Sequence, residues 1–304
     1  MTHRAILFIA AVAALALFAP DRTAAQALPR GAELRVITAD DSPATRQIIQ
    51  GLLRRHPSLQ SSSDPRTLAA RKGPAVYLAV GPAALSAAIG ADLDGPLISA
   101  FTSSPIYNEI VGQSRRRTGI TAIYAEASPI HQLRLTSQLY GRRVTVGVLT
   151  SQNTEYLEPI IRQAARSSNL DVEFSRVEPG DNVLRALTRL GMSTAILAVP
   201  DPLIYTPANL RNILESTYRR NQPVIGFSTS LVNAGTMATV YSTIDDILAQ
   251  LEEVLDTVAS GRVPEAQFPR YWRVAINENV ARSLNVVVND EVRSMGERPP
   301  ERSR

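Results

Sequence analysis

The residue of this chain that is best placed to do chemistry is Asp201, which lies between two prolines. Residues 194–199 are short, apolar or β-branched, a pattern typical of a fully buried parallel strand. Pro200 and Pro202 end that strand, because proline has no amide hydrogen to donate to the ladder. Ligands of open α/β sheets bind outside the carboxyl ends of the strands, so Asp201 is a candidate contact for a cation or a hydroxyl group. The alternative is a turn residue whose side chain caps its own backbone.

Small polar residues, turns and helix starts recur at the ends of the other predicted strands. Hydroxyls, amides and helix N-termini at one edge of a sheet can hydrogen-bond a small polar solute from two sides. The same residue types also cap helices, which every α/β protein needs. The predicted ligand-binding residues are Ser42, Gly81, Pro82, Thr102, Ser103, Ser104, Ser151, Asn153, Asp201 and Ser228.

Catalytic and metal-binding signatures are nearly missing from the sequence. Beyond the first 27 residues the only histidines are His56 and His131, and the chain has no cysteine, which argues against a transition-metal site. Residues 226–230 half-resemble a nucleophile elbow around Ser228, but the second glycine is missing. No phosphate-binding glycine motif follows a strand, so we expect no catalytic residue, metal or cofactor.

The basic composition does not indicate a nucleic-acid-binding protein. The formal net charge is +4, but Lys72 is the only lysine among 32 basic residues, and the arginines are interleaved with 28 acidic residues. The longest basic run is residues 115–117. A nucleic-acid-binding protein usually gathers its basic residues on one face or stripe, so we expect no nucleic-acid partner.

The first 27 residues have the pattern of a cleaved signal peptide. Arg4 precedes an unbroken apolar segment, residues 5–18, and Ala25-Gln-Ala27 is a small-x-small cleavage site. The apolar segment is too short to span a bilayer, and a lipid anchor on cysteine is excluded by composition. We therefore expect residues 1–27 to be removed and the mature protein to be periplasmic.

Strands and helices alternate along the rest of the chain, which predicts parallel sheets with helices on both faces. There are too many predicted strands for one sheet, and the predicted helix at residues 128–140 is a natural boundary. The predicted fold class is therefore α/β, with two Rossmann-like lobes. Residues 293–304 end in a charged, proline-rich segment, which favours a disordered tail.

Three segments resemble the substrate-binding proteins of ABC importers, which are type I periplasmic binding proteins. They are Pro223-Val-Ile-Gly-Phe-Ser228, Val232-Asn-Ala-Gly235 and Val274-Ala-Ile-Asn-Glu-Asn-Val-Ala-Arg-Ser-Leu284, and the most specific part is the I-N-x-x-x-A-x-x-L pattern of the last. The chain departs from the family in having Ser104 where an acidic residue is common before a proline, and Ser242 where glycine is common. The first lobe is also shorter, as if one strand–helix unit were missing.

The resemblance implies two lobes joined by a three-strand hinge. The first lobe would be residues 28–127 plus 237–263, and the second would be residues 128–236 plus 264–292. A monomer would close around a small-molecule solute and then dock on an inner-membrane ABC permease.

We therefore expect a periplasmic solute-binding protein of an ABC importer, whose ligand is small and polar, such as an amino acid or a related amine held by Asp201. One alternative is a periplasmic sensor or accessory subunit that uses the same cleft without transport. A third hypothesis is an exported hydrolase with Ser228 as nucleophile, which would require a histidine beside that serine.

Overall fold

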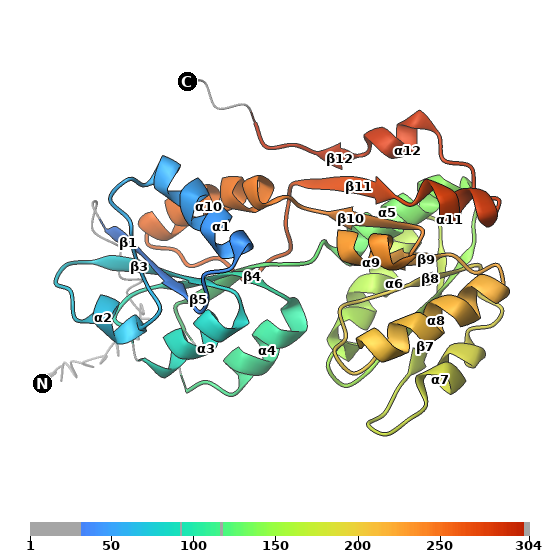
Figure 1. Cartoon of the computed structure of the whole chain (residues 1–304), viewed down its shortest axis with the longest axis horizontal. Helices are drawn as coiled ribbons and strands as arrows, with labels where there is room; N and C mark the ends of the chain where they lie inside the picture. The colour runs from blue at the N-terminus through green and yellow to red at the C-terminus, as the bar shows by residue number, and fades with distance from the viewer. Residues whose placement is uncertain (1–31, 92, 116–117, 301–304) are drawn as a thin grey trace, which may run out of the picture.

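A computed structural model describes residues 32–91, 93–115 and 118–300 of the chain. These residues form two α/β lobes, each built on its own sheet, as the sequence predicts (Figure 1). The predicted signal peptide, residues 1–27, lies outside the described residues, as do residues 301–304. None of the described helices has the length and hydropathy that a membrane span requires.

The first lobe contains a sheet of five parallel strands in the order β2-β1-β3-β4-β5. Apolar residues fill nearly every position of its central strand, as expected for a parallel sheet that is covered on both faces. The strands are β1 (Glu33–Thr38), β2 (Gln60–Ser62), β3 (Ala75–Val80), β4 (Leu97–Thr102) and β5 (Ile120–Tyr124).

Helices cover both faces of this first sheet. One hydrophobic core joins the sheet to α1 and α10, and contains Leu52 of α1 and Leu248 and Leu251 of α10. A second core on the other face contains Leu85 of α3 and Tyr107 of α4. The helices of this lobe are α1 (Pro43–Arg55), α2 (Pro65–Ala69), α3 (Pro82–Gly90), α4 (Ser104–Gly112) and α10 (Ile244–Ala259).

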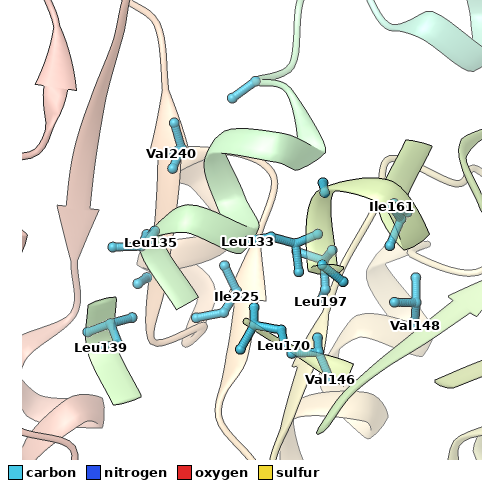
Figure 2. Packing of buried hydrophobic residues seen from close by; sticks show 14 of the residues in the cluster. Leu133, Leu135, Leu139, Val146, Val148, Ile161, Leu170, Leu197, Ile225 and Val240 are labelled. Carbon is cyan, nitrogen blue, oxygen red and sulfur yellow. The ribbon is translucent and has the colours of Figure 1, made fainter. Parts of the chain in front are cut away.

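The second lobe is built on a sheet of seven strands in the order β12-β11-β10-β9-β8-β6-β7. Its strands are β6 (Thr145–Thr150), β7 (Asp171–Arg176), β8 (Ala195–Leu197), β9 (Val224–Gly226), β10 (Ala238–Tyr241), β11 (Trp272–Ile276) and β12 (Gly296–Glu297). Its helices are α5 (Pro129–Tyr140), η1 (Glu155–Leu157), α6 (Glu158–Ser167), α7 (Val183–Arg189), α8 (Pro207–Arg219), α9 (Thr229–Ala234), α11 (Glu278–Ser283) and α12 (Asp290–Ser294). Figure 2 shows the core of this lobe, where Leu133 of α5 lies near Leu197 and Ile225 of the sheet.

The structure corrects the predicted lobe boundaries. Residues 237–241 belong to the second lobe, because β10 pairs with β9 and β11 of the second sheet. Residues 264–268 stay with the first lobe, because Gln267 exchanges backbone hydrogen bonds with β5 through Ala122 and Tyr124. The chain therefore returns to the first lobe near residue 242 and leaves it again after residue 268.

Backbone pairing also corrects three other predictions, which concern the missing strand–helix unit, the parallel sheets and the disordered tail. The strand–helix unit that the first lobe was expected to lack is present in reduced form, as the short strand β2 followed by α2. β11 pairs antiparallel with β10, because the chain enters this strand from the other lobe rather than from a helix on its own sheet. The predicted tail is ordered in part, since α12 and β12 extend to Glu297 and β12 pairs with β11.

Three connections join the lobes, at residues 125–128, 242–243 and 269–271, and polar contacts brace the last two. The Ser242 hydroxyl donates to the carbonyl of Tyr271. Arg273 of β11 donates two 2.9 Å hydrogen bonds to Asp246 in the first turn of α10. Burial opposes ionisation of Asp246, but the bonds from Arg273 and Thr243 outweigh it and hold the pKa of this carboxyl below its usual value.

Replacement of Asp246 by asparagine should reduce the free energy of unfolding at pH 7 by about 1–3 kcal/mol. Because the folded-state pKa is lowered, this contribution is present above the ordinary aspartate pKa and disappears as the pH falls through the lowered value. Denaturant unfolding of wild type and Asp246→Asn at pH 7 and pH 3 measures the difference. The control is Asp256→Asn, an exposed position on the same helix. An equal loss at both pH values would contradict this role for the ionised carboxylate.

Candidate functional site

The carboxyl ends of the two sheets meet at a hydrogen bond between the lobes. The Tyr156 hydroxyl donates a 2.7 Å hydrogen bond to the Ser104 hydroxyl. Tyr156 lies in η1, which follows β6 of the second sheet, and Ser104 follows β4 of the first sheet. Ser104 in turn donates to Glu126 in the first connection between the lobes. We call Ser104, Glu126 and Tyr156 the interlobe junction.

Glu126 is held against the beginning of α4. The backbone amide of Ser104 donates to both carboxylate oxygens, over 3.0 and 3.2 Å, and the Ser104 hydroxyl donates to the same carboxylate. Amide groups at a helix N-terminus carry partial positive charge and favour an anionic group. The helix begins here because Pro105 suits the first turn and ends the extended backbone of β4.

The carboxyl group of Glu126 is deeply buried, with 5% of the residue exposed. Burial raises the pKa of Glu126 above the usual glutamate value, although the hydrogen bonds from Ser104 oppose the shift. No arginine, lysine or histidine among the described residues forms an ion pair with this carboxylate. The junction therefore contains a buried acidic group whose charge is balanced only by hydrogen bonds and a helix end.

Aromatic side chains of the first lobe lie next to the junction. Tyr107 of α4 and Tyr124 of β5 are in edge contact at 5.5 Å, and Tyr124 contacts Phe268 in the same way at 5.0 Å. Burial raises the pKa of Tyr107 to about 12 and that of Tyr124 further, with Glu126 adding to the second shift. Both phenols therefore stay neutral at physiological pH.

A backbone irregularity positions the first-lobe part of the junction. The register between β4 and β5 shifts between Ala100 and Thr102, and Phe101 between them has φ 61°, in the left-handed region that large side chains rarely adopt. The carbonyl of Thr102 then accepts a 3.0 Å hydrogen bond from the amide of Ala125. This bond fixes the connection that carries Glu126 beside the start of α4.

Asp201 lies in the second lobe, and its carboxylate accepts hydrogen bonds from residues of that same lobe. The hydroxyls of Ser151 and Thr154 donate to one carboxylate oxygen over 2.7 and 2.5 Å, and the amide of Leu203 donates to the other over 2.9 Å. Only 1% of Asp201 is exposed. These contacts favour the turn alternative over the predicted cation contact, because Asp201 joins the loop after β8 to the loop after β6.

Several other predicted ligand-binding residues serve as helix starts. Ser42 caps α1 and Ser228 caps α9 by accepting a backbone amide, and Gly81 precedes Pro82 at the start of α3 with φ 83°. Ser103 precedes α4 without a side-chain capping bond, and Thr102 accepts a hydrogen bond from the Ser99 hydroxyl. Asn153 donates its amide to the Ser151 hydroxyl in the loop after β6. Of the predicted set, Ser104 takes part in the bond between the lobes.

Tyr205 adds an unsatisfied polar group on the second-lobe side. Its hydroxyl is buried and has no hydrogen-bond partner among the described residues, and its ring contacts Phe227 edge-on at 5.8 Å. Burial raises the pKa of Tyr205, and the nearby carboxylate of Asp201 adds to the shift. Burial raises the pKa of Tyr156, and the carboxylates of Glu126 and Asp201 both add to the shift, so Tyr156 lies near both acidic groups.

The histidines do not form a catalytic pair with Ser228 in the described structure. His56 contacts Glu252 over 3.1 Å in the first lobe. His131 stacks on Trp272 at 4.7 Å, and burial together with Arg134 lowers its pKa to about 4. The Ser228 hydroxyl accepts the amide of Leu231 as a helix cap, so the hydrolase hypothesis finds no serine–histidine contact here.

Sequence reasoning missed Glu126, Tyr156 and the neighbouring aromatic residues. Glu126 follows β5 by two residues, which is the same position relative to a strand end that made Asp201 a candidate. It was overlooked because residues 125–128 look like an ordinary connection to the next helix. Tyr156 carries no such signal, since its partner is 52 residues away in the chain.

Replacement of Asp201 by alanine should reduce the free energy of unfolding by about 1–3 kcal/mol, because two buried hydroxyls and an amide lose their acceptor. Urea unfolding of the purified variant measures this. Asp256→Ala on the surface of α10 is the control and should stay within about 0.5 kcal/mol of wild type. Unchanged stability of Asp201→Ala would return Asp201 to the list of candidate ligand contacts.

Comparison with known proteins identifies the fold through solved structures. No family model matches the chain, and no curated protein does. A ligand-free, open substrate-binding protein with adhesive properties from Clostridium difficile is similar over 86% of this chain and 97% of its own, with 14% identity and a TM-score of 0.62. An ABC domain in complex with L-Trp from Streptococcus pneumonia covers the same shares, with 18% identity and a TM-score of 0.55. A conserved domain protein from Vibrio cholerae also covers these shares, with 17% identity and a TM-score of 0.54. This chain therefore has the two-lobed fold of the type I periplasmic solute-binding proteins.

Proposed function

We propose that this protein binds a small polar solute between its two lobes and delivers it to the permease of an ABC importer. The observation that carries the proposal is the interlobe junction, where buried polar groups from the carboxyl ends of both sheets come within hydrogen-bonding distance. Ligands of α/β proteins bind at these strand ends. The similarity to a substrate-binding protein and to a domain complexed with L-Trp supports the same assignment.

The three connections between the lobes supply a mechanism for closure. Hinge motion of two rigid lobes requires only a few residues between them to change backbone conformation. Here those residues number from two to four in each connection, and each lobe has hydrophobic cores of its own. A solute that contacts both lobes favours the closed arrangement by the free energy of those additional contacts.

The proposed site of action is the periplasm, and the proposed acceptor is an inner-membrane permease. The basic, apolar and small-residue pattern of residues 1–27 supports export, and the cysteine-free sequence leaves no residue for a thioether-linked lipid. We infer that the mature protein acts as a monomer, because one chain already contributes both halves of the junction. No cofactor is required for binding and release.

A thermal-shift screen of the mature protein tests the function. We expect one class among amino acids, polyamines, sugars and nucleosides to raise the melting temperature, because a ligand at 100 times its Kd stabilises the folded state by about 2.7 kcal/mol. Buffer of equal ionic strength is the control for nonspecific effects. No stabilisation by any class would contradict a solute-binding role.

Lobe closure can be measured separately. The chain lacks cysteine, so spin labels can be placed at Glu109→Cys on α4 and Gln163→Cys on α6, two exposed positions on different lobes. We expect the stabilising compound to shorten the distance between the labels, since its contacts with both lobes favour closure. Binding without any change in this distance would argue against the hinge mechanism.

A further inference from the structure

The carboxylate of Glu126 lies in an environment that leaves its charge only partly compensated. Its partners are the amide and hydroxyl of Ser104 and its own backbone amide, and it lies away from solvent. Burial of an ionised carboxylate without a cationic partner is costly, and proteins usually pair such groups. Among the other buried acidic groups of the described lobes, Asp246 is paired with Arg273, and Asp201 accepts three hydrogen bonds within its own lobe.

The carboxylate also has unused capacity to accept hydrogen bonds. A carboxylate group offers about four lone-pair positions. The Ser104 hydroxyl and amide both approach Oε1, and Oε2 receives the longer, 3.2 Å branch of the amide bond. The backbone amide of Glu126 itself also bonds to the carboxylate, which leaves about one acceptor position. A further donor can therefore approach Oε2 without displacing Ser104.

The surroundings favour a cationic donor. Tyr107, Tyr124 and Phe268 form a continuous aromatic cluster beside the junction, and the faces of aromatic rings attract cations. On the second-lobe side, the buried Tyr205 hydroxyl has no hydrogen-bond partner among the described residues and lies near the carboxylate of Asp201. An anionic solute would add like charge to Glu126 and Asp201, and a neutral sugar would leave Glu126 unpaired.

We propose that the solute is an amine whose ammonium group pairs with the Glu126 carboxylate at the interlobe junction. The inference rests on the solute-binding function proposed above and narrows the ligand to amino acids, polyamines or similar cations. It also moves the cation contact from Asp201, whose carboxylate is held by donors of its own lobe, to Glu126 beside the contact between the lobes. Tyr156 closes over this site from the second lobe, because its hydroxyl donates to the serine that holds the carboxylate.

The test compares wild type with Glu126→Gln, using calorimetric titration with L-tryptophan, L-ornithine, spermidine, D-ribose and uridine. We expect at least one of the three amines to bind wild type, and the variant to bind it about 10- to 100-fold more weakly, as for loss of a charge-assisted hydrogen bond. Glu109→Gln on the surface of the same lobe is the matched control and should bind as wild type does.

Thermal stability without solute separates a binding role from a structural one. Burial disfavours the ionised form of Glu126 in the folded protein, so at neutral pH Glu126→Gln should melt at the same temperature as wild type or higher. Glu126→Asp keeps the charge and should retain the preference for amines at reduced affinity. This second variant keeps the test decisive if the glutamine variant folds poorly.

The remaining outcomes overturn the inference in different ways. Binding of D-ribose or uridine alone would leave the solute-binding function standing and refute the amine. Unchanged amine affinity in Glu126→Gln, with or without a lower melting temperature, would make Glu126 a structural residue. Binding of none of the five compounds, with no hit in the wider thermal screen, would refute the solute-binding function and this inference together.

Discussion

The hydrogen bonds between Ser104 and Glu126 are the interaction on which the site depends. They join the end of one strand, the start of a helix and the first connection between the lobes at a single buried carboxylate. Tyr156 reaches this carboxylate through Ser104 from the opposite lobe. A hydrogen bond weakens steeply with distance and angle. The series of hydrogen bonds from Tyr156 through Ser104 to Glu126 can therefore form only when the two lobes are close together. The contact between the lobes and the polar environment of Glu126 are therefore parts of one arrangement.

The connections between the lobes and the interlobe junction differ in how well the folded protein stabilises a buried carboxylate in its ionised form. Near the hinge, Asp246 is compensated by Arg273 and by the cap of α10, so its ionised form is favoured in the folded protein. At the junction, Glu126 has no such cation among the described residues and its ionised form is disfavoured. Strained or uncompensated groups persist where the surrounding structure holds them, and they gather at functional sites. Phe101, with its left-handed backbone beside the same strand end, fits this pattern.

Most of the fold was predictable because its signals are local. Apolar strands such as β3, and helix starts such as Ser42-Pro43 and Thr206-Pro207, have their physical causes within a few residues. The predictions that were wrong concern pairing. Residues 237–241 were assigned to the first lobe but pair with strands of the second, since an apolar strand does not by its composition indicate which sheet it will join. β2 was missed because three polar residues lack the alternation that marks a strand.

The amino-acid sequence by itself determined the α/β class, the division into two lobes and the position of polar residues at the strand ends. Only the tertiary structure decided what those residues do. Asp201 and Glu126 both follow strands, and their difference lies in neighbours that come from distant segments. Asp201 accepts hydrogen bonds from Ser151 and Thr154 of its own lobe, whereas Glu126 accepts from Ser104, which also receives Tyr156 of the opposite lobe. The physical reason is that strand formation follows local side-chain chemistry, whereas the compensation of a buried charge depends on which side chains the folded lobes bring within about 3 Å of it.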